Sequence, residues 1–272
     1  MPVKPRHAAT VILIRESRDP SRGPLELLMV RRHPASRFVA DSYVFPGGCL
    51  DEDDCSDEME GFCTGLDQKH ARLVIRDMVP PEFSLAAWIA GIRETFEEVG
   101  ILMAYDWRGC PVSLESGEIR ERISGYRKEL YTGRMKFQDI LRKEKLTLST
   151  DRLHYYSHWI TPEPLPLRYD VRFFVAEAPQ NQKALHDGFE LTDHVWITPQ
   201  EALVSYREKR FNMVLPTIMT MKELCNFDKV DEVILSTRDK QIPAILTRMV
   251  RKGKEFVEIM PDGSIFGPSP VR

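Results

Sequence analysis

The sequence predicts an α/β protein, with a mixed sheet packed between helices. Short segments rich in β-branched and aliphatic residues alternate with amphipathic segments of helical period. Residues 8–14 and 25–30 are expected to form two paired strands, because a turn sequence, Asp-Pro-Ser-Arg-Gly-Pro, separates them. Residues 171–176, Val-Arg-Phe-Phe-Val-Ala, suit the interior of the sheet.

The other elements follow in chain order. Residues 101–105, 159–161 and 195–197 are expected as strands, residues 115–131, 136–145 and 215–227 as helices, and Thr198-Pro199 as the start of a further helix. Residues 231–250 add a helix or strand and a terminal strand at 244–249. We expect one domain over residues 1–272, with an insertion at about 49–84 and a C-terminal extension from about 228.

Composition is that of a globular protein without strong charge. The net charge of −3 gives no electrostatic reason to expect a nucleic-acid or membrane partner, and no apolar run approaches a membrane-spanning length. The five cysteines show no disulfide framework, and the C-terminus, Pro-Ser-Pro-Val-Arg, lacks a Ser-Lys-Leu address. We therefore expect a cytoplasmic protein. A homodimer is compatible with the sequence.

The most informative segment is Arg-Glu-Thr-Phe-Glu-Glu-Val-Gly at residues 93–100. On a helix, Glu94, Glu97 and Glu98 fall within an arc of about 100°, with the apolar side chains on the opposite side. Glu94 and Glu98 form a like-charge i,i+4 pair that costs an isolated helix about 0.2–0.5 kcal/mol. Oxygen ligands on a rigid helix suit a hard divalent cation, so we predict a magnesium site there.

These residues resemble the signature of the Nudix hydrolases, in which a glycine-led loop precedes a helix of this pattern. Gly48, Arg93, Glu94, Glu97, Glu98, Gly100 and Ile101 stand at matching positions, and Thr95 replaces the usual aliphatic residue. The signature is interrupted by the insertion within residues 49–84. Asp54 has the spacing from Gly48 of an intermediate glutamate but lies far from Arg93 in the chain, so its role is left unassigned.

The interrupted signature, with Phe-Pro-Gly-Gly-Cys-Leu-Asp at 45–51 and Trp-Ile-Thr-Pro at 159–162, looks like the branch that contains the peroxisomal coenzyme A diphosphatases. The resemblance implies an α/β/α sandwich and metal-dependent hydrolysis of a nucleoside diphosphate linked to another group, with Mg²⁺, or alternatively Mn²⁺, as cofactor. Coenzyme A or acyl-coenzyme A is the favoured substrate. ADP-ribose, a dinucleotide, or nucleotide sensing without turnover are the alternatives.

The resemblance also implies roles for individual residues. Glu94, Glu97 and Glu98 are the expected metal ligands, and Glu94, Glu98, Arg93 and Glu190 the expected catalytic residues. Glu190, outside the signature, would complete the metal shell or act as base, with Asp187 and Asp193 as the other acids to consider. Gly47 and Gly48 would contact the substrate. The 3′-phosphate of coenzyme A needs a basic partner, for which Arg31 and Arg37 are expected and Arg32 is also available.

Three other sets of residues are expected to have no catalytic role. The acidic run at 51–54 predicts a solvated loop, and Cys55, Cys63 and His70 lack the spacing of a structural zinc site. Arg168 and Arg172 could reach a phosphate, but ion pairs are the favoured expectation.

Overall fold

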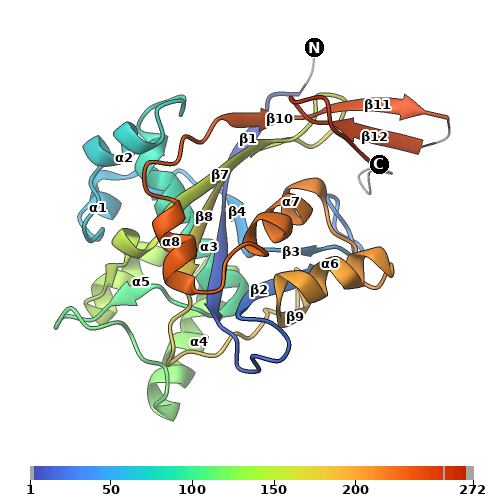
Figure 1. Cartoon of the computed structure of the whole chain (residues 1–272). Coiled ribbons are helices and arrows are strands. Elements are labelled where there is room, and N and C mark those ends of the chain that lie inside the picture. Colours follow the sequence, from blue (N-terminus) through green and yellow to red (C-terminus); the bar gives the residue numbers. More distant parts are fainter. Residues whose placement is uncertain (1–2, 254, 268–272) are drawn as a thin grey trace.

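A computed structural model describes residues 3–253 and 255–267, and it contains an eight-stranded mixed sheet (Figure 1). Its strands are β1 (Arg6–Glu16), β2 (Leu25–Arg32), β3 (Tyr43–Val44), β4 (Gly47–Cys49), β7 (His154–Ile160), β8 (Tyr169–Glu177), β9 (Leu191–Ile197) and β10 (Ala244–Leu246). They run in the order β10-β7-β8-β1-β2-β3, with β4 beside β1 and β9 beside β2. β1 is parallel to β8 and antiparallel to β2, which confirms the mixed sheet and the pairing of the first two strands.

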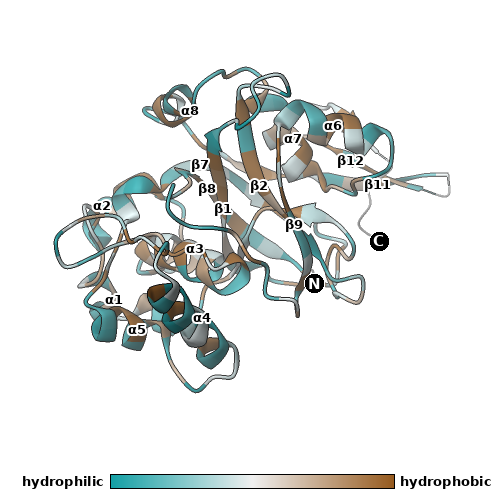
Figure 2. Ribbon diagram, turned by 90° about the horizontal axis from the view of Figure 1, so that it is seen from below, coloured by the Kyte–Doolittle hydropathy of each residue, from teal (hydrophilic) through white to brown (hydrophobic). Residues whose placement is uncertain are grey.

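Helices cover both faces of this sheet (Figures 1 and 2). One side carries α1 (Asp57–Glu60), α2 (Gln68–Val74), α3 (Phe83–Val99), α4 (Gly117–Tyr131) and α5 (Phe137–Glu144), and the other carries α6 (Pro199–Arg207), α7 (Leu215–Leu224) and α8 (Val230–Ser236). Alternate residues of β1 serve the two cores, because successive side chains of a strand point to opposite faces. Ala9, Val11 and Leu13 pack toward α3, whereas Ile12 and Ile14 pack in the other core. The α/β/α sandwich is therefore confirmed.

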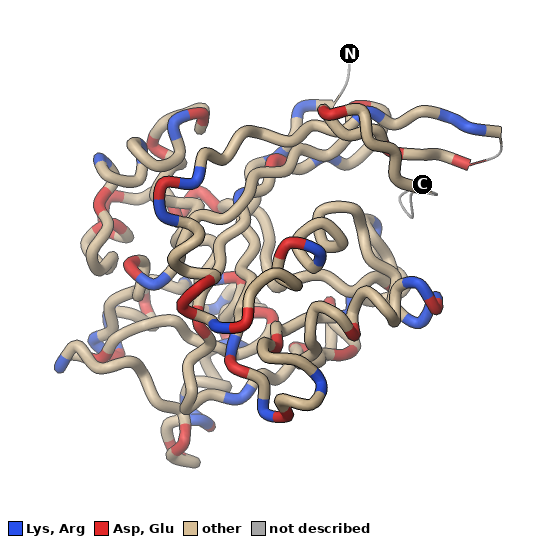
Figure 3. The backbone as a smooth tube through the Cα atoms, viewed as in Figure 1, with Lys and Arg blue, Asp and Glu red and all other residues tan. Residues whose placement is uncertain are grey.

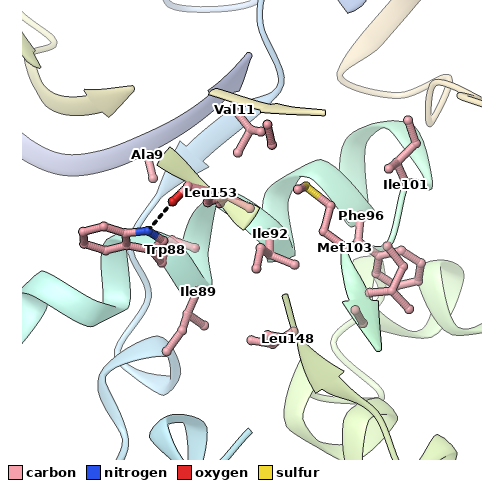
Figure 4. Packing of buried hydrophobic residues seen from close by; sticks show 14 of the residues in the cluster. Ala9, Val11, Trp88, Ile89, Ile92, Phe96, Ile101, Met103, Leu148 and Leu153 are labelled. Carbon is pink, nitrogen blue, oxygen red and sulfur yellow. Dashed lines mark hydrogen bonds between the residues drawn. The ribbon is translucent and has the colours of Figure 1, made fainter. Parts of the chain in front are cut away.

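Helix α3 lies tightly on β1 (Figure 4). Ile89, Ile92 and Phe96 are almost fully buried, and Trp88 donates a hydrogen bond from Nε1 to the Leu153 carbonyl at 3.0 Å. A Cβ atom added at Gly91 would lie 3.0 Å from Val11 Cγ2, so the glycine permits this close approach. The helix ends at Gly100, whose φ of 71° is a left-handed C-cap.

The buried Thr95 of α3 does not leave an unsatisfied hydroxyl. Its Oγ1 donates to the Gly91 carbonyl at 2.7 Å. A threonine therefore replaces the usual aliphatic residue here without the cost of a lone buried polar group.

The inserted segment is more ordered than a solvated loop. It contains η1 (Asp53–Cys55) and the short helices α1 and α2, and Asp54 is only 3% exposed. The expectation of a solvated acidic run at 51–54 was therefore wrong for Asp54, which pairs with a buried cation described below.

Two smaller sheets complete the fold. β5 (Ala104–Tyr105) pairs with β6 (Thr147–Leu148), close to η2 (Thr150–Arg152), and β11 (Arg248–Lys252), β12 (Glu255–Ile259) and β13 (Ile265–Phe266) form a three-stranded sheet. The strand expected at 244–249 is divided between β10 and β11, and β10 joins the central sheet beside β7. The sequence did not predict β12 and β13. The C-terminal segment 268–272 lies outside the described residues.

Acidic and basic residues are spread over the fold (Figure 3). Among the described residues, no helix combines the length and apolar character needed to cross a bilayer.

Candidate active site

The three glutamates of α3 line a cavity of about 530 Å³ together with the glycines of β4. Gly47 donates its backbone N–H to Glu98 Oε2 at 2.8 Å. A Cβ atom at Gly48 would lie 2.3 Å from the Glu94 carboxyl carbon, and one at Gly47 would lie 2.3 Å from the Ala9 carbonyl oxygen. A side chain at position 47 would therefore clash with the β1 backbone, and one at position 48 would displace the Glu94 carboxylate.

Arg93 is a buried cation held by carboxylates from two parts of the chain. Its guanidinium donates from Nε and Nη2 to Asp54 at 2.9 and 2.8 Å, and from Nη1 to Glu94 at 2.9 Å and Glu97 at 3.3 Å. Asp54, left unassigned from the sequence, is thus brought next to Arg93 by the insertion. The six-residue spacing from Gly48 to Asp54 was the signal that could have assigned it.

Burial makes ionisation of these glutamates unfavourable. It raises the pKa of Glu94 to about 7, with the nearby Arg93 charge opposing and the Glu97 charge adding to the shift. It raises the pKa of Glu98 well above its ordinary value, and Glu94 contributes. The pKa of Glu97 is also raised, again chiefly by burial. The positive charge of Arg93 therefore does not offset the effect of burial on the pKa values of these carboxylates.

Glu190 reaches the same cavity from a different element. It lies exposed just before β9, lines the cavity and adds to the raised pKa of Glu98 by its charge. The two other acids considered have structural partners: Asp187 accepts hydrogen bonds from three backbone N–H groups of its loop, and Asp193 accepts one from the Tyr43 hydroxyl at 3.1 Å. Glu190 is therefore the one of these three acids that lines the cavity.

The arginines expected at the substrate are divided. Arg31 is paired with Asp41 at 2.6 Å and Arg37 is exposed, and neither lines the cavity. Arg32 does line it, and so does Arg6, which the sequence did not suggest. The substrate contacts of Arg31 and Arg37 stay predictions.

The expectation of ion pairing holds for Arg172, which is fully buried and forms ion pairs with Asp77 and Asp170. Arg168 instead donates to the backbone carbonyls of Thr161 and Val3. Neither arginine lines the cavity.

In this arrangement Glu94 and Glu97 accept hydrogen bonds from Arg93, and Glu98 accepts one from Gly47, so the three carboxylates do not converge on a single metal position. Within residues 3–253 and 255–267, no three His, Cys, Asp or Glu side chains are gathered closely enough to hold a metal ion. The donor chemistry nevertheless fits a hard cation, because buried carboxylates with raised pKa values would be relieved by further positive charge.

Comparison with known proteins agrees with this geometry. The family model described as the NUDT19 Nudix domain matches residues 5–224. This chain belongs to the NUDT19 branch of the Nudix hydrolase family. Relatives in this branch include the acyl-coenzyme A diphosphatase NUDT19 of Xenopus laevis, 25% identical over 76% of this chain, and that of Homo sapiens, 24% identical over 85%.

The match spans 62% of the Xenopus protein and 72% of the human one. Among solved structures, a Nudix hydrolase from Alicyclobacillus acidocaldarius is similar with a TM-score of 0.68 and 24% identity, over 85% of this chain and 96% of that one. This likeness shows the Nudix fold.

Proposed function

We propose that this chain hydrolyses the diphosphate of coenzyme A or acyl-coenzyme A, giving adenosine 3′,5′-bisphosphate and phosphopantetheine or its acyl derivative. The observation that carries the proposal is the cavity in which Glu94, Glu97 and Glu98 meet the two glycines of β4, in a chain of the NUDT19 branch. The relatives named acyl-coenzyme A diphosphatase support the choice of substrate.

Glu94, Glu97 and Glu98 would hold Mg²⁺, or alternatively Mn²⁺. When bound, the cation would neutralise the diphosphate oxygens and lower the pKa of a coordinated water. Arg93 would keep the rotamers of Glu94 and Glu97 fixed, and Asp54 would hold Arg93 in turn. Glu190, exposed at the cavity, would accept the proton of the attacking water or complete the metal shell.

Two other functions remain as alternatives. ADP-ribose or a dinucleotide carries the same diphosphate, and a sensing domain would bind the nucleotide with little turnover. The intact set of Glu94, Glu97 and Glu98 at the cavity favours hydrolysis, since binding alone needs fewer carboxylates beside an anionic ligand.

A panel of diphosphates assayed with Mg²⁺ tests the proposal. We expect kcat/KM to be highest for coenzyme A or one of its acyl esters, and turnover to require the metal. Faster cleavage of ADP-ribose or a dinucleotide would reject coenzyme A while keeping the hydrolase. Tight nucleotide binding without turnover of any of them would favour the sensor.

The 3′-phosphate gives a second comparison. A charge-assisted contact to it should favour coenzyme A over dephospho-coenzyme A by about 10- to 150-fold in kcat/KM. Arg31→Ala, Arg37→Ala and Arg32→Ala should be compared, and the residue that binds the phosphate is the one whose loss narrows this preference. Equal cleavage of the two compounds by wild type would show that the enzyme makes no favourable contact with the 3′-phosphate. The cytoplasmic location and the homodimer stay predictions.

A further inference from the structure

The cavity is an elongated trough that crosses the sheet from the glutamates to the C-terminal segment. Five neighbouring strands, β4, β1, β8, β7 and β10, each contribute one residue to a row of sheet partners that crosses the sheet. In that order the residues are Cys49, Ala8, Val171, Trp159 and Ile245. The first four line the cavity, and Thr247 and Glu258 line it beyond β10. At about 4.8 Å between strands, the row measures about 14 Å from Cys49 to Trp159 and about 19 Å to Ile245.

The two ends of the trough differ in polarity. The basic residues that line it lie near the glutamates: Arg93 pairs with Glu94, the Arg32 charge opposes the raised pKa of Glu98, and the Arg6 charge opposes that of Cys49. The far end is mostly apolar, with Trp159, Ile160 and Leu165 among the residues that line the cavity. Glu258 is buried there and accepts a hydrogen bond from the Thr247 hydroxyl at 2.8 Å. An uncharged arm suits this end better than a phosphate, whose basic partners lie at the other end.

We propose that the pantetheine arm and its acyl group occupy this trough, so that residues 244–260 form the far wall that sets acyl-chain preference. The inference rests on the proposed function. Phosphopantetheine, built from pantoate, β-alanine and cysteamine, is about as long as a four-residue peptide, about 14 Å when extended. Its thiol end therefore reaches Trp159 and Ile160 when its phosphate lies beside β4. The adenosine bisphosphate half lies at the end that holds Arg6, Arg32 and Arg93, toward solvent.

Leu165, buried at the far end, gives the test. Leu165→Trp fills the trough and Leu165→Ala widens it, while Leu235→Trp makes the same change on the exposed side of α8, away from the cavity. Each methylene that is buried is worth up to about fourfold in affinity. Leu165→Trp should therefore lower kcat/KM for octanoyl-coenzyme A at least about tenfold, chiefly by raising KM. Leu165→Ala should shift the preference toward longer chains, and Leu235→Trp should change neither.

Product-like inhibitors show which half of the substrate lies in the trough. S-octanoyl-pantetheine should inhibit wild type and lose at least about tenfold in affinity with Leu165→Trp. Adenosine 3′,5′-bisphosphate should inhibit both proteins equally. The reverse pattern, in which only the bisphosphate loses affinity, overturns the inference.

The outcome separates this inference from the proposed function. If wild type cleaves acyl-coenzyme A but chain-length preference is unchanged in both Leu165 variants, only the trough assignment is wrong. If wild type cleaves no coenzyme A compound, both fail. Should Leu165→Trp not fold, Leu165→Ala and the wild-type inhibition by S-octanoyl-pantetheine still decide the matter.

Discussion

Two buried arginines of this protein are surrounded by carboxylates, but their surroundings differ in charge balance. Arg93 contacts Asp54, Glu94 and Glu97 at the cavity, and Glu98 lies beside them. Arg172 contacts Asp77 and Asp170 on the other face of β8, where His7 and His158 also face Asp170. The first cluster has more carboxylates than basic groups, and the second has more basic groups than carboxylates.

The pKa values follow this difference. In the Arg172 cluster, burial opposes the ionisation of Asp170, but hydrogen bonds from His158 and His7 and the Arg172 charge outweigh it and hold the pKa of Asp170 well below its usual range. At the cavity the pKa values of Glu94, Glu97 and Glu98 are all raised. The basic groups of the Arg172 cluster are enough to stabilise ionised Asp170, whereas the Arg93 cluster would be stabilised by an added cation.

The insertion contributes a carboxylate to each cluster. Asp54 binds Arg93 on α3, and Asp77 binds Arg172 on β8 with an Nη2 to Oδ1 distance of 3.2 Å. The segment is therefore held to α3 by a buried ion pair and to β8 by an ion pair whose carboxylate is exposed. Only the first of these supports side chains that line the cavity.

Loss of a glutamate from the Arg93 cluster should have the largest effect on activity. Glu97→Gln or Glu98→Gln should lower kcat/KM at least about a hundredfold, because glutamine keeps the size but loses the charge that would bind the metal. Added Mg²⁺ should also raise the Tm of wild type but not of either variant, since a ligand of the folded state stabilises it.

Glu121→Gln is the matched control, because Glu121 is exposed on α4 and lies outside the cavity. It should behave as wild type. Near-normal turnover of Glu97→Gln and Glu98→Gln at limiting Mg²⁺ would contradict the metal assignment of these two residues.

Asp54→Asn tests the link between the insertion and the same cluster. The variant leaves Arg93 with fewer carboxylates, so the rotamers of Glu94 and Glu97 should be held less well. Changes in such supporting contacts typically cost about 10- to 100-fold in activity or metal affinity. The apparent metal affinity, measured by titrating activity with Mg²⁺, should fall together with kcat. If the variant unfolds more easily but keeps its metal affinity, Asp54 contributes to the stability of the fold and not to metal binding.

Glu190→Gln concerns an exposed acid of the cavity that lies outside α3. If it acts as base or metal ligand, kcat should fall by about tenfold or more while KM changes little, because the interaction matters chiefly in the transition state. The comparison variant is Asp187→Asn, whose carboxylate accepts hydrogen bonds from its own loop. An unaltered kcat and pH–rate profile for Glu190→Gln would show that Glu190 is an ordinary surface residue without a catalytic role.

The sequence predicted the sheet and the α3 glutamates because both depend on local periodicity. Alternating apolar residues in β1 and the i, i+3, i+4 pattern of α3 indicate their buried faces without knowledge of the partner. Glu190 also reached the cavity as expected, although its role is untested.

What the sequence could not supply is pairing between distant segments. Asp54 is 39 residues from Arg93, and Asp77 is 95 residues from Arg172. The parallel pairing of β10 with β7, which places Thr247 at the end of the trough, likewise depends on tertiary packing and leaves no local pattern. For the same reason Arg31 was favoured over Arg32, since their neighbouring positions do not reveal which one pairs with Asp41.

The smallest effect on activity is expected in the Arg172 cluster, with Asp170→Asn. Asp170 alternates along β8 with Val171, which lines the cavity, so its side chain points to the opposite face, and kcat/KM at pH 7 should stay within about twofold of wild type. Stability should change instead. Because the folded-state pKa of Asp170 lies below the unfolded value of about 3.9, its ionised form stabilises the fold above about pH 4, and this contribution is lost as the pH falls through the folded pKa.

Urea unfolding of wild type and Asp170→Asn at several pH values measures this contribution. The variant should be the less stable protein at neutral pH, and the difference should shrink as the pH is lowered below about 4. A gap that is constant with pH would mean that Asp170 contributes through packing and not through its charge. A large loss of turnover in a folded variant would show that the two clusters are coupled across β8, and the contrast between them would then no longer hold.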